Sequence, residues 1–177
     1  MKKLLYFAAL LLCAGLTSCE KEEIGGTATE AMAGKWYVSV DAVDESGNLV
    51  YSDDELFEIG RFHIITNNTA ANIPTEMVVN DLGQFWRFKV KVNCDQQSLT
   101  FQTNTTQNNN LWPDHEDINV SITDGKILPK AGRQNNGAPA DSIVFYVSFS
   151  DDEYPAAYGY AKYKVSGIRY SGLEEND

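Results

Sequence analysis

The sequence predicts an all-β fold, an antiparallel barrel of eight strands, with a β-sandwich as the alternative. Almost every segment after Gly34 alternates apolar and polar residues with a period of two, as half-buried strands do. Turn residues separate these segments at regular intervals, and no long stretch shows the helical period that a βαβ crossover needs. A chain of 177 residues is expected to form one such domain.

The first half of the chain contains the clearest alternation. Strands are expected at residues 34–42, 61–66, 75–79 and 86–94. In the last of these, Trp86, Phe88 and Val90 share one dry face, while charged residues occupy the other. Residues 53–59 are the one helix-like stretch, and it is short.

The second half continues the same pattern. Strands are expected at residues 99–103, 118–123, 126–128, 143–149 and 157–168. Asp124-Gly125 predicts a two-residue hairpin, because this pair favours the backbone conformation of tight β-turns. In the final strand, Tyr158 and Tyr160 are expected on one face and Tyr163 on the other.

The N-terminus has the pattern of an export signal. Two lysines precede an apolar run at 4–16, which is shorter than the about 20 residues that span a bilayer. The motif Leu16-Thr17-Ser18-Cys19 resembles the bacterial lipobox, and this resemblance implies that Cys19 becomes the lipidated first residue of the mature chain. We therefore expect a lipid-anchored protein of the bacterial outer membrane, on the periplasmic face or the cell surface.

These features divide the chain into four expected parts. They are a lipoprotein signal peptide at 1–18, a flexible acidic tether at 19–32, a single β-barrel domain at 33–172 and a disordered C-terminal tail at 173–177. Once Cys13 is removed with the signal and Cys19 is acylated, Cys94 has no cysteine to pair with. The core alone must then hold the fold.

Charge narrows the choice of partners. The formal net charge is −11, and an acidic surface repels the phosphate backbone of nucleic acids, so DNA and RNA are not expected as partners. The remaining expected partners are the membrane, through the anchor at Cys19, and a small lipid-like ligand.

Two resemblances refine the barrel prediction. Gly34-Lys35-Trp36 is similar to the Gly-x-Trp motif of lipocalin-like barrels, which implies that Trp36 closes one end with Arg169 packed over it. From 33 to 170 the chain also resembles a family of bacterial lipoproteins described as lipid-binding putative hydrolases, with a lipocalin-like barrel. The stretches that carry this resemblance are AGKWYV at 33–38, FWRFKVKV at 85–92, ADSI at 140–143, FSDD at 149–152 and YKVSGIR at 163–169.

Catalytic motifs are absent from the sequence. It contains no Gly-x-Ser-x-Gly elbow, no His-Glu-x-x-His zinc motif and no glycine-rich phosphate loop. We therefore expect binding without catalysis, with no cofactor and no metal. A hydrolase remains an alternative, because the family description implies one and because Ser142 and His115 could form a nucleophile and base.

The predicted function is to bind a small apolar or amphipathic ligand at the cell envelope. Barrels of eight strands are either filled by side chains or just wide enough for one small ligand. The candidate ligand-binding residues are the aromatic residues of the dry faces, namely Trp36, Trp86, Phe88, Phe101, Phe145 and Phe149. The alternative is a surface module that holds a glycan or a protein through Tyr37, Tyr146, Tyr158 and Tyr160.

Overall fold

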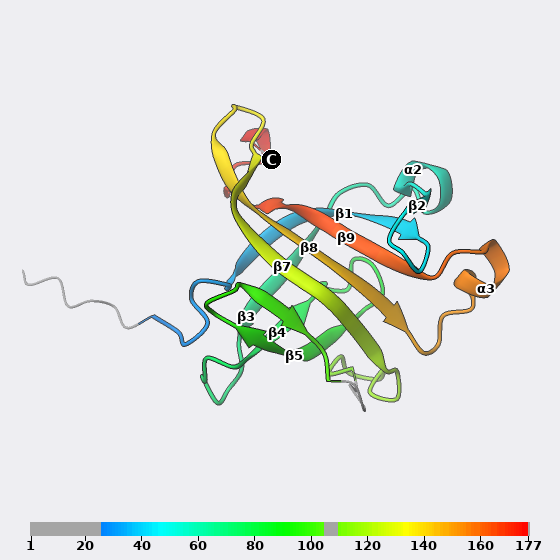
Figure 1. Cartoon of the computed structure of the whole chain (residues 1–177), viewed down its shortest axis with the longest axis horizontal. Coiled ribbons are helices and arrows are strands. Elements are labelled where there is room, and N and C mark those ends of the chain that lie inside the picture. Colours follow the sequence, from blue (N-terminus) through cyan, green and yellow to red (C-terminus); the bar gives the residue numbers. More distant parts are fainter. Residues whose placement is uncertain (1–25, 105–109, 177) are drawn as a thin grey trace, which may run out of the picture.

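Eight antiparallel strands close into a barrel in the computed structural model, which describes residues 26–104 and 110–176 (Figure 1). Within these residues the sheet has nine strands, and all of them except β2 form the barrel. They are β1 (Gly34–Val43), β2 (Leu49–Tyr51), β3 (Phe62–Asn68), β4 (Glu76–Asn80), β5 (Lys89–Asp95), β6 (Thr100–Gln102), β7 (Val120–Arg133), β8 (Pro139–Phe149) and β9 (Lys162–Arg169). From β3 to β9 each strand pairs with the next, and β1 pairs with both β3 and β9. The short β2 pairs only with the end of β1.

This closure confirms the predicted barrel. The β1–β9 ladder runs from Trp36 opposite Arg169 to Val43 opposite Lys162, so the two ends of the sheet are joined along most of their length. Closure removes the free edges that an open sheet would present. The β-sandwich alternative is wrong, because a sandwich consists of two sheets and this is one continuous ring.

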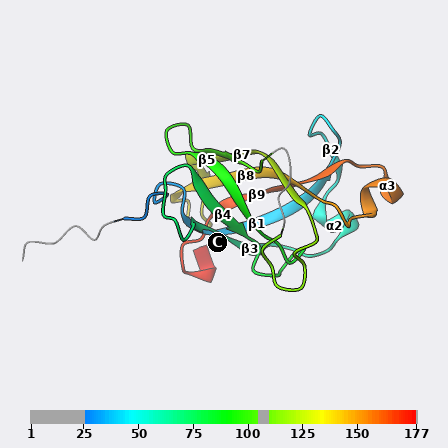
Figure 2. The ribbon, with the colours of Figure 1, turned by 90° about the horizontal axis from the view of Figure 1, so that it is seen from below.

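The two ends of the barrel differ (Figures 1 and 2). The loops that contain α2 (Asp53–Leu56) and α3 (Tyr154–Tyr158) lie at one end, which we call the open end. The described chain begins at the other end, which we call the closed end, and the C-terminal turn η1 (Glu174–Asn176) is also there. The predicted signal peptide, residues 1–18, and the predicted lipid site Cys19 lie outside the described residues.

The inward face of each strand supplies the core. In β1, Trp36, Val38 and Val40 alternate with partly or fully exposed residues and are fully buried themselves. The largest fully buried side chains are Trp36, Tyr163, Phe88 and Phe145. These side chains fill the barrel interior, so space for a ligand is expected at the ends.

No helix among the described residues is long and apolar enough to cross a membrane.

Asp124-Gly125 forms a bulge within β7, so the predicted hairpin there is wrong. The register with β8 shifts between Thr123 and Lys126, and Asp124 has a left-handed φ of 53°. Gly125 is required here, because a Cβ at this position would lie 2.5 Å from the Phe101 ring. The hairpin between β7 and β8 lies further on, at 134–138, where Gln134 N–H donates to the Ala138 carbonyl at 2.9 Å. The bulge bends β7 while it remains one long strand.

The last strand starts later than the sequence predicts. Residues 154–158 form α3, which has Pro155 in its first turn and ends at Gly159, a left-handed cap with φ 77°. Tyr158 therefore lies on an exposed helix, and the prediction that Tyr160 faces away from Tyr163 is wrong. Both of these tyrosines are buried, and their hydroxyls are 2.7 Å apart.

Candidate functional site

A pocket lies at the open end of the barrel between three loops. One part has a volume of about 390 Å³ and is lined by Leu56, Phe57, Ile59, Phe85, Trp86, Tyr154 and Tyr158. The adjoining part, of about 440 Å³, is lined by Trp86, Asp151, Asp152, Glu153, Tyr154, Ala157 and Tyr158. Because Trp86, Tyr154 and Tyr158 line both parts, we treat them as one site, the mouth pocket. Small-molecule sites typically have volumes of roughly 300–1,000 Å³.

An aromatic floor separates the mouth pocket from the core. The Trp86 ring stacks on Phe149, with centroids 5.0 Å apart and planes 9° apart. Phe85 lies edge-on to Tyr163 at 5.1 Å and contacts Phe57 at 6.4 Å. These rings make the pocket floor continuous with the packed interior, so a ligand would rest on a firm apolar surface.

A single buried carboxylate positions the loop that carries Phe85 and Trp86. Asp81 is fully buried, and its two carboxylate oxygens accept five backbone N–H bonds at 2.8–3.1 Å. The donors are Gly83, Phe85, Trp86, Arg87 and Phe88. Arg87 has a left-handed φ of 53°, and for this reason β5 starts at Lys89 instead of at Trp86 as predicted. The loop around Asp81 is thus a turn that fixes Trp86 over the open end.

A second buried carboxylate orders the loop after α2. Asp53 accepts the backbone N–H groups of Ile59 at 3.1 Å and Gly60 at 2.6 Å. Ser52 precedes α2 as its N-cap and forms a capping box with Glu55, and the hydrogen bonds from Ser52 hold the pKa of Glu55 below its usual value. This loop presents Phe57 and Ile59 to the pocket.

Acidic side chains form the third wall. Asp151 accepts the indole N–H of Trp86 at 3.1 Å. Asp152 accepts the Tyr163 hydroxyl at 2.6 Å and the backbone N–H of Tyr154 at 2.9 Å. Burial raises the pKa of Tyr160 to about 12 and raises the pKa of Tyr163 above its usual value, with the Asp152 bond adding to the effect at Tyr163. Both tyrosines are therefore neutral at physiological pH, and Tyr163 can donate to Asp152.

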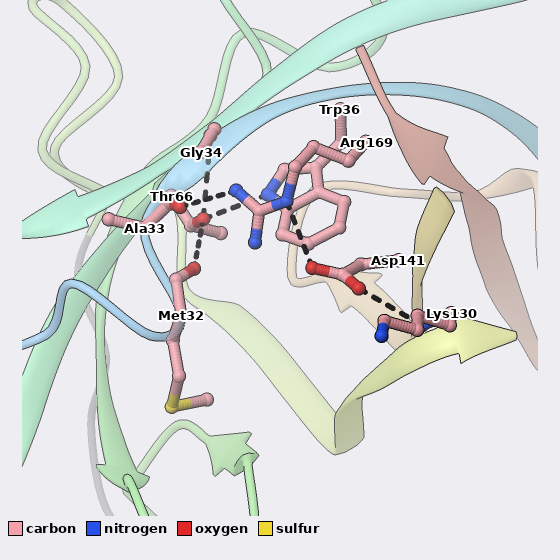
Figure 3. A network of polar contacts seen from close by, with 8 residues as sticks. All are labelled: Met32, Ala33, Gly34, Trp36, Thr66, Lys130, Asp141 and Arg169. Carbon is pink, nitrogen blue, oxygen red and sulfur yellow. Dashed lines mark hydrogen bonds and ion pairs between the residues drawn. The ribbon is translucent and has the colours of Figure 1, made fainter. Parts of the chain in front are cut away.

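The closed end is sealed by a network around Arg169 (Figure 3). The guanidinium lies 4.3 Å from the centre of the Trp36 ring, donates to the Ala33 carbonyl at 2.7 Å and pairs with Asp141 at 3.2 Å. A Cβ on Gly34 would collide with the Arg169 guanidinium, so a larger residue there would displace the guanidinium from this position. The structure thus brings the three predicted closure residues, Gly34, Trp36 and Arg169, together at one end of the barrel.

The six candidate ligand-binding residues do not form a single site. Trp36 is fully buried at the closed end, and Phe101 contacts Phe145 at 5.8 Å inside the barrel. Phe88 and Phe149 are buried below the open end and contact each other at 5.5 Å. Of the six, only Trp86 lines the mouth pocket.

Sequence reasoning missed most of the pocket lining. Phe57 and Phe85 belong to loops and Tyr154 begins α3, so these three follow no strand alternation, while Tyr158 was expected in the last strand and belongs to α3 instead. The available signal was the turn chemistry, because Asn80-Asp81-Leu82-Gly83 precedes Phe85 and Trp86 and marks a turn that ends in two adjacent aromatic residues.

The four tyrosines considered for the alternative function, a surface that holds a glycan or a protein, are dispersed in the structure. Tyr37 lies under Arg61 at 4.2 Å and Tyr146 lies under Lys162 at 4.5 Å, while Tyr158 is on α3 and Tyr160 is buried, so these four tyrosines do not form one patch.

The two residues considered as the nucleophile and base of a hydrolase are also separated. Ser142 pairs with Ile168 near the closed end, whereas His115 lies in the loop between β6 and β7 at the open end. Within the ranges 26–104 and 110–176, no cluster of three or more His, Cys, Asp or Glu side chains is placed to hold a metal ion.

Comparison with protein families finds a match. The model of a family described as lipid-binding putative hydrolases matches residues 21–174, which include the whole barrel. A search of the curated proteins finds no match.

Proposed function

We propose a function from one established premise: the chain belongs to the family of lipid-binding putative hydrolases. The proposed function is to hold one small apolar or amphipathic ligand in the mouth pocket, without catalysis. The observation that carries this proposal is the aromatic pocket at the open end, where Trp86, Tyr154 and Tyr158 border two adjoining cavities of ligand size.

The chemistry of the lining favours an apolar chain. Leu56, Phe57, Ile59 and Phe85 supply apolar surface on one side of the pocket, and burial of such surface contributes about 25 cal/mol per Å². Polar groups are concentrated on the opposite side, in the segment from Asp151 to Glu153. A pocket with one apolar wall and one charged wall suits a molecule with an alkyl part and a polar head.

Two observations support binding without catalysis. Ser142 and His115, the nucleophile and base considered from the sequence, lie toward opposite ends of the barrel. In the mouth pocket, Asp151 and Asp152 accept hydrogen bonds from Trp86 and Tyr163, which fix rings in place. These carboxylates act as supports for the aromatic floor.

We propose in addition that Cys19 anchors the protein in the outer membrane. The described chain begins at the closed end, so a tether from Cys19 would join the barrel opposite the mouth pocket (Figures 1 and 2). Cys19→Ser should abolish labelling with a palmitate analogue, and unchanged labelling would contradict the anchor.

The binding proposal is tested with the neutral fluorophore N-phenyl-1-naphthylamine, which brightens in apolar pockets. Tyr154 and Tyr158 are about half exposed, at 50% and 47%, so replacing both with alanine removes pocket wall without opening the core. We expect the double variant to bind the fluorophore at least about fivefold more weakly, because each lost aromatic contact contributes about 0.5–1.5 kcal/mol.

The matched control replaces Tyr37 and Tyr170, two half-buried tyrosines on the outer face of the barrel, with alanine. It should bind the fluorophore as the unaltered protein does. Equal affinity in all three proteins would mean that the mouth pocket is not the binding site. Native mass spectrometry of the protein purified from cells then identifies a co-purified ligand.

A further inference from the structure

We propose that the mouth pocket selects ligands with a cationic head, such as an alkylammonium, over neutral and anionic amphiphiles. This inference rests on the proposed function, because it names the ligand class of the same pocket. The charge and the ring geometry of the lining carry it.

The charge of the lining has one sign. Asp151, Asp152 and Glu153 border the larger cavity, and neither lining includes a lysine or an arginine. Arg87 follows Trp86 in the chain but is not among the residues that line the pocket. Lys162, near the same end, lies over the Tyr146 ring at 4.5 Å. A cation entering the larger cavity therefore meets carboxylates without a competing positive charge from the lining.

Aromatic rings surround the same space. One face of Trp86 stacks on Phe149, so the other face is the one available to the pocket. Tyr154 stands edge-on to Trp86, at 6.2 Å and 85°, and Tyr158 follows at 5.9 Å from Tyr154. All three rings line the larger cavity, and aromatic rings gathered around one volume are how proteins bind quaternary ammonium groups.

The hydrogen bonds of this wall keep the rings and the charge together. Asp151 accepts the Trp86 indole N–H at 3.1 Å, so its charge is held at the edge of the indole ring. Asp152 fixes the start of α3 through the backbone N–H of Tyr154. The aromatic faces and the carboxylates are therefore parts of one structure, and a cationic head can contact both.

The same wall disfavours an anionic head. A fatty-acid carboxylate at the head position would approach three acidic side chains. Repulsion between like charges would add to the cost of removing the carboxylate from water. A neutral head group avoids the repulsion but gains neither the ion pair nor the cation–π contact.

The test uses three amphiphiles that share one alkyl chain: decyltrimethylammonium, decyl maltoside and decanoate, each below its micellar concentration. Isothermal titration calorimetry at low salt should show decyltrimethylammonium binding about tenfold more tightly than decyl maltoside, with decanoate weakest. Raising the salt to about 0.5 M should reduce the advantage of the cation, because exposed charges are screened.

Variants separate charge from shape. Asp151→Asn with Glu153→Gln removes two charges but keeps an oxygen to accept the Trp86 N–H. This variant should bind decyltrimethylammonium roughly 3- to 10-fold more weakly, and its affinity for decyl maltoside should be unchanged. The control, Glu30→Gln with Glu175→Gln, removes two exposed charges that do not line the mouth pocket and should change neither affinity.

The possible results distinguish the two proposals. If decyl maltoside or decanoate binds as tightly as the cation, and binding is lost in the Tyr154→Ala/Tyr158→Ala protein, the head-group inference is overturned and the pocket is retained. If no amphiphile depends on these tyrosines, both proposals fail. The inference is also overturned if the charge-removing variant loses as much affinity for decyl maltoside as for the cation, because the effect of the substitutions is then structural.

Discussion

Asp81→Asn is the substitution that most directly tests how the mouth pocket is built. The aspartate is fully buried, with one oxygen accepting two backbone N–H groups and the other accepting three. Asparagine has the same shape, but it replaces one of these oxygens with an NH₂ group, which donates. Whichever way the amide turns, at least two backbone donors lose their acceptor.

The magnitude follows from those donors. Each buried donor left without a partner costs about 1–3 kcal/mol, so two of them cost about 2–6 kcal/mol. Removing a buried charge returns part of this cost, because the carboxylate no longer has to be desolvated on folding. We expect the substitution to lower the free energy of unfolding by about 2–3 kcal/mol in total, which is large beside the about 5–15 kcal/mol that is typical of a whole domain.

Urea unfolding followed by tryptophan fluorescence measures the free energy of unfolding directly. The native spectrum adds a local readout, because the backbone N–H of Trp86 donates to Asp81, and the indole should become more exposed to water when this bond is lost. Asp95→Asn is the control, since Asp95 is exposed and orders a surface turn through Gln97. A change below about 0.5 kcal/mol in Asp81→Asn, with an unaltered spectrum, would refute the positioning role.

Three other predictions concern the closed end, a buried hydroxyl and the thiol. Arg169→Ala should lower the free energy of unfolding by about 2–3 kcal/mol. A double-mutant cycle with Trp36→Phe should show a coupling energy of at least about 0.5 kcal/mol, and strictly additive effects would contradict the contact between the two side chains. The pKa of Tyr160 rises from about 10 in the unfolded chain to about 12 in the folded protein. The neutral hydroxyl therefore contributes its full share to the free energy of unfolding below pH 10, and this share is lost as the pH rises toward 12. Urea unfolding between pH 8 and 11 should therefore show falling stability, with a shallower fall in Tyr160→Phe. Burial raises the pKa of Cys94, so a maleimide at pH 7 should label it slowly until urea is added, and rapid native labelling would contradict this.

The barrel was predictable because its strands follow a simple rule. A half-buried strand alternates strictly, and β1 and β8 show this alternation in the sequence and in their burial. The closed end was predictable for a different reason. The register of β1 against β9 pairs Trp36 directly with Arg169, and Gly34 lies two residues earlier in β1. These residues were predicted through the resemblance of Gly34-Lys35-Trp36 to the Gly-x-Trp motif of lipocalin-like barrels, and the ladder between β1 and β9 is what brings Trp36 and Arg169 together.

The mouth pocket was not predictable from alternation, because loops and not strands build it. The alternation predicts that Trp86 begins a strand, since Phe88 and Val90 follow it at the right spacing. Asp81 overrides that pattern by binding five backbone N–H groups, which turns the chain before β5 begins. In the last connection, Pro155 and Gly159 start and stop a helix where tyrosines suggested a strand. In both places local hydrogen bonding or backbone conformation prevails over side-chain periodicity.

The two ends of the barrel therefore divide stability and binding between them. At the closed end, Arg169 joins β9 to the N-terminal segment through Ala33 and covers a fully buried Trp36, so substitutions there should lower stability with little effect on a ligand at the other end. At the open end, Tyr154 and Tyr158 are exposed, so their loss should lower affinity with little effect on unfolding. Asp81 is the exception, because it is buried like a core residue and yet fixes the loop that lines the pocket. Of these substitutions, only those at Asp81 should lower both quantities together, and this joint loss distinguishes a positioned pocket from an incidental surface hollow.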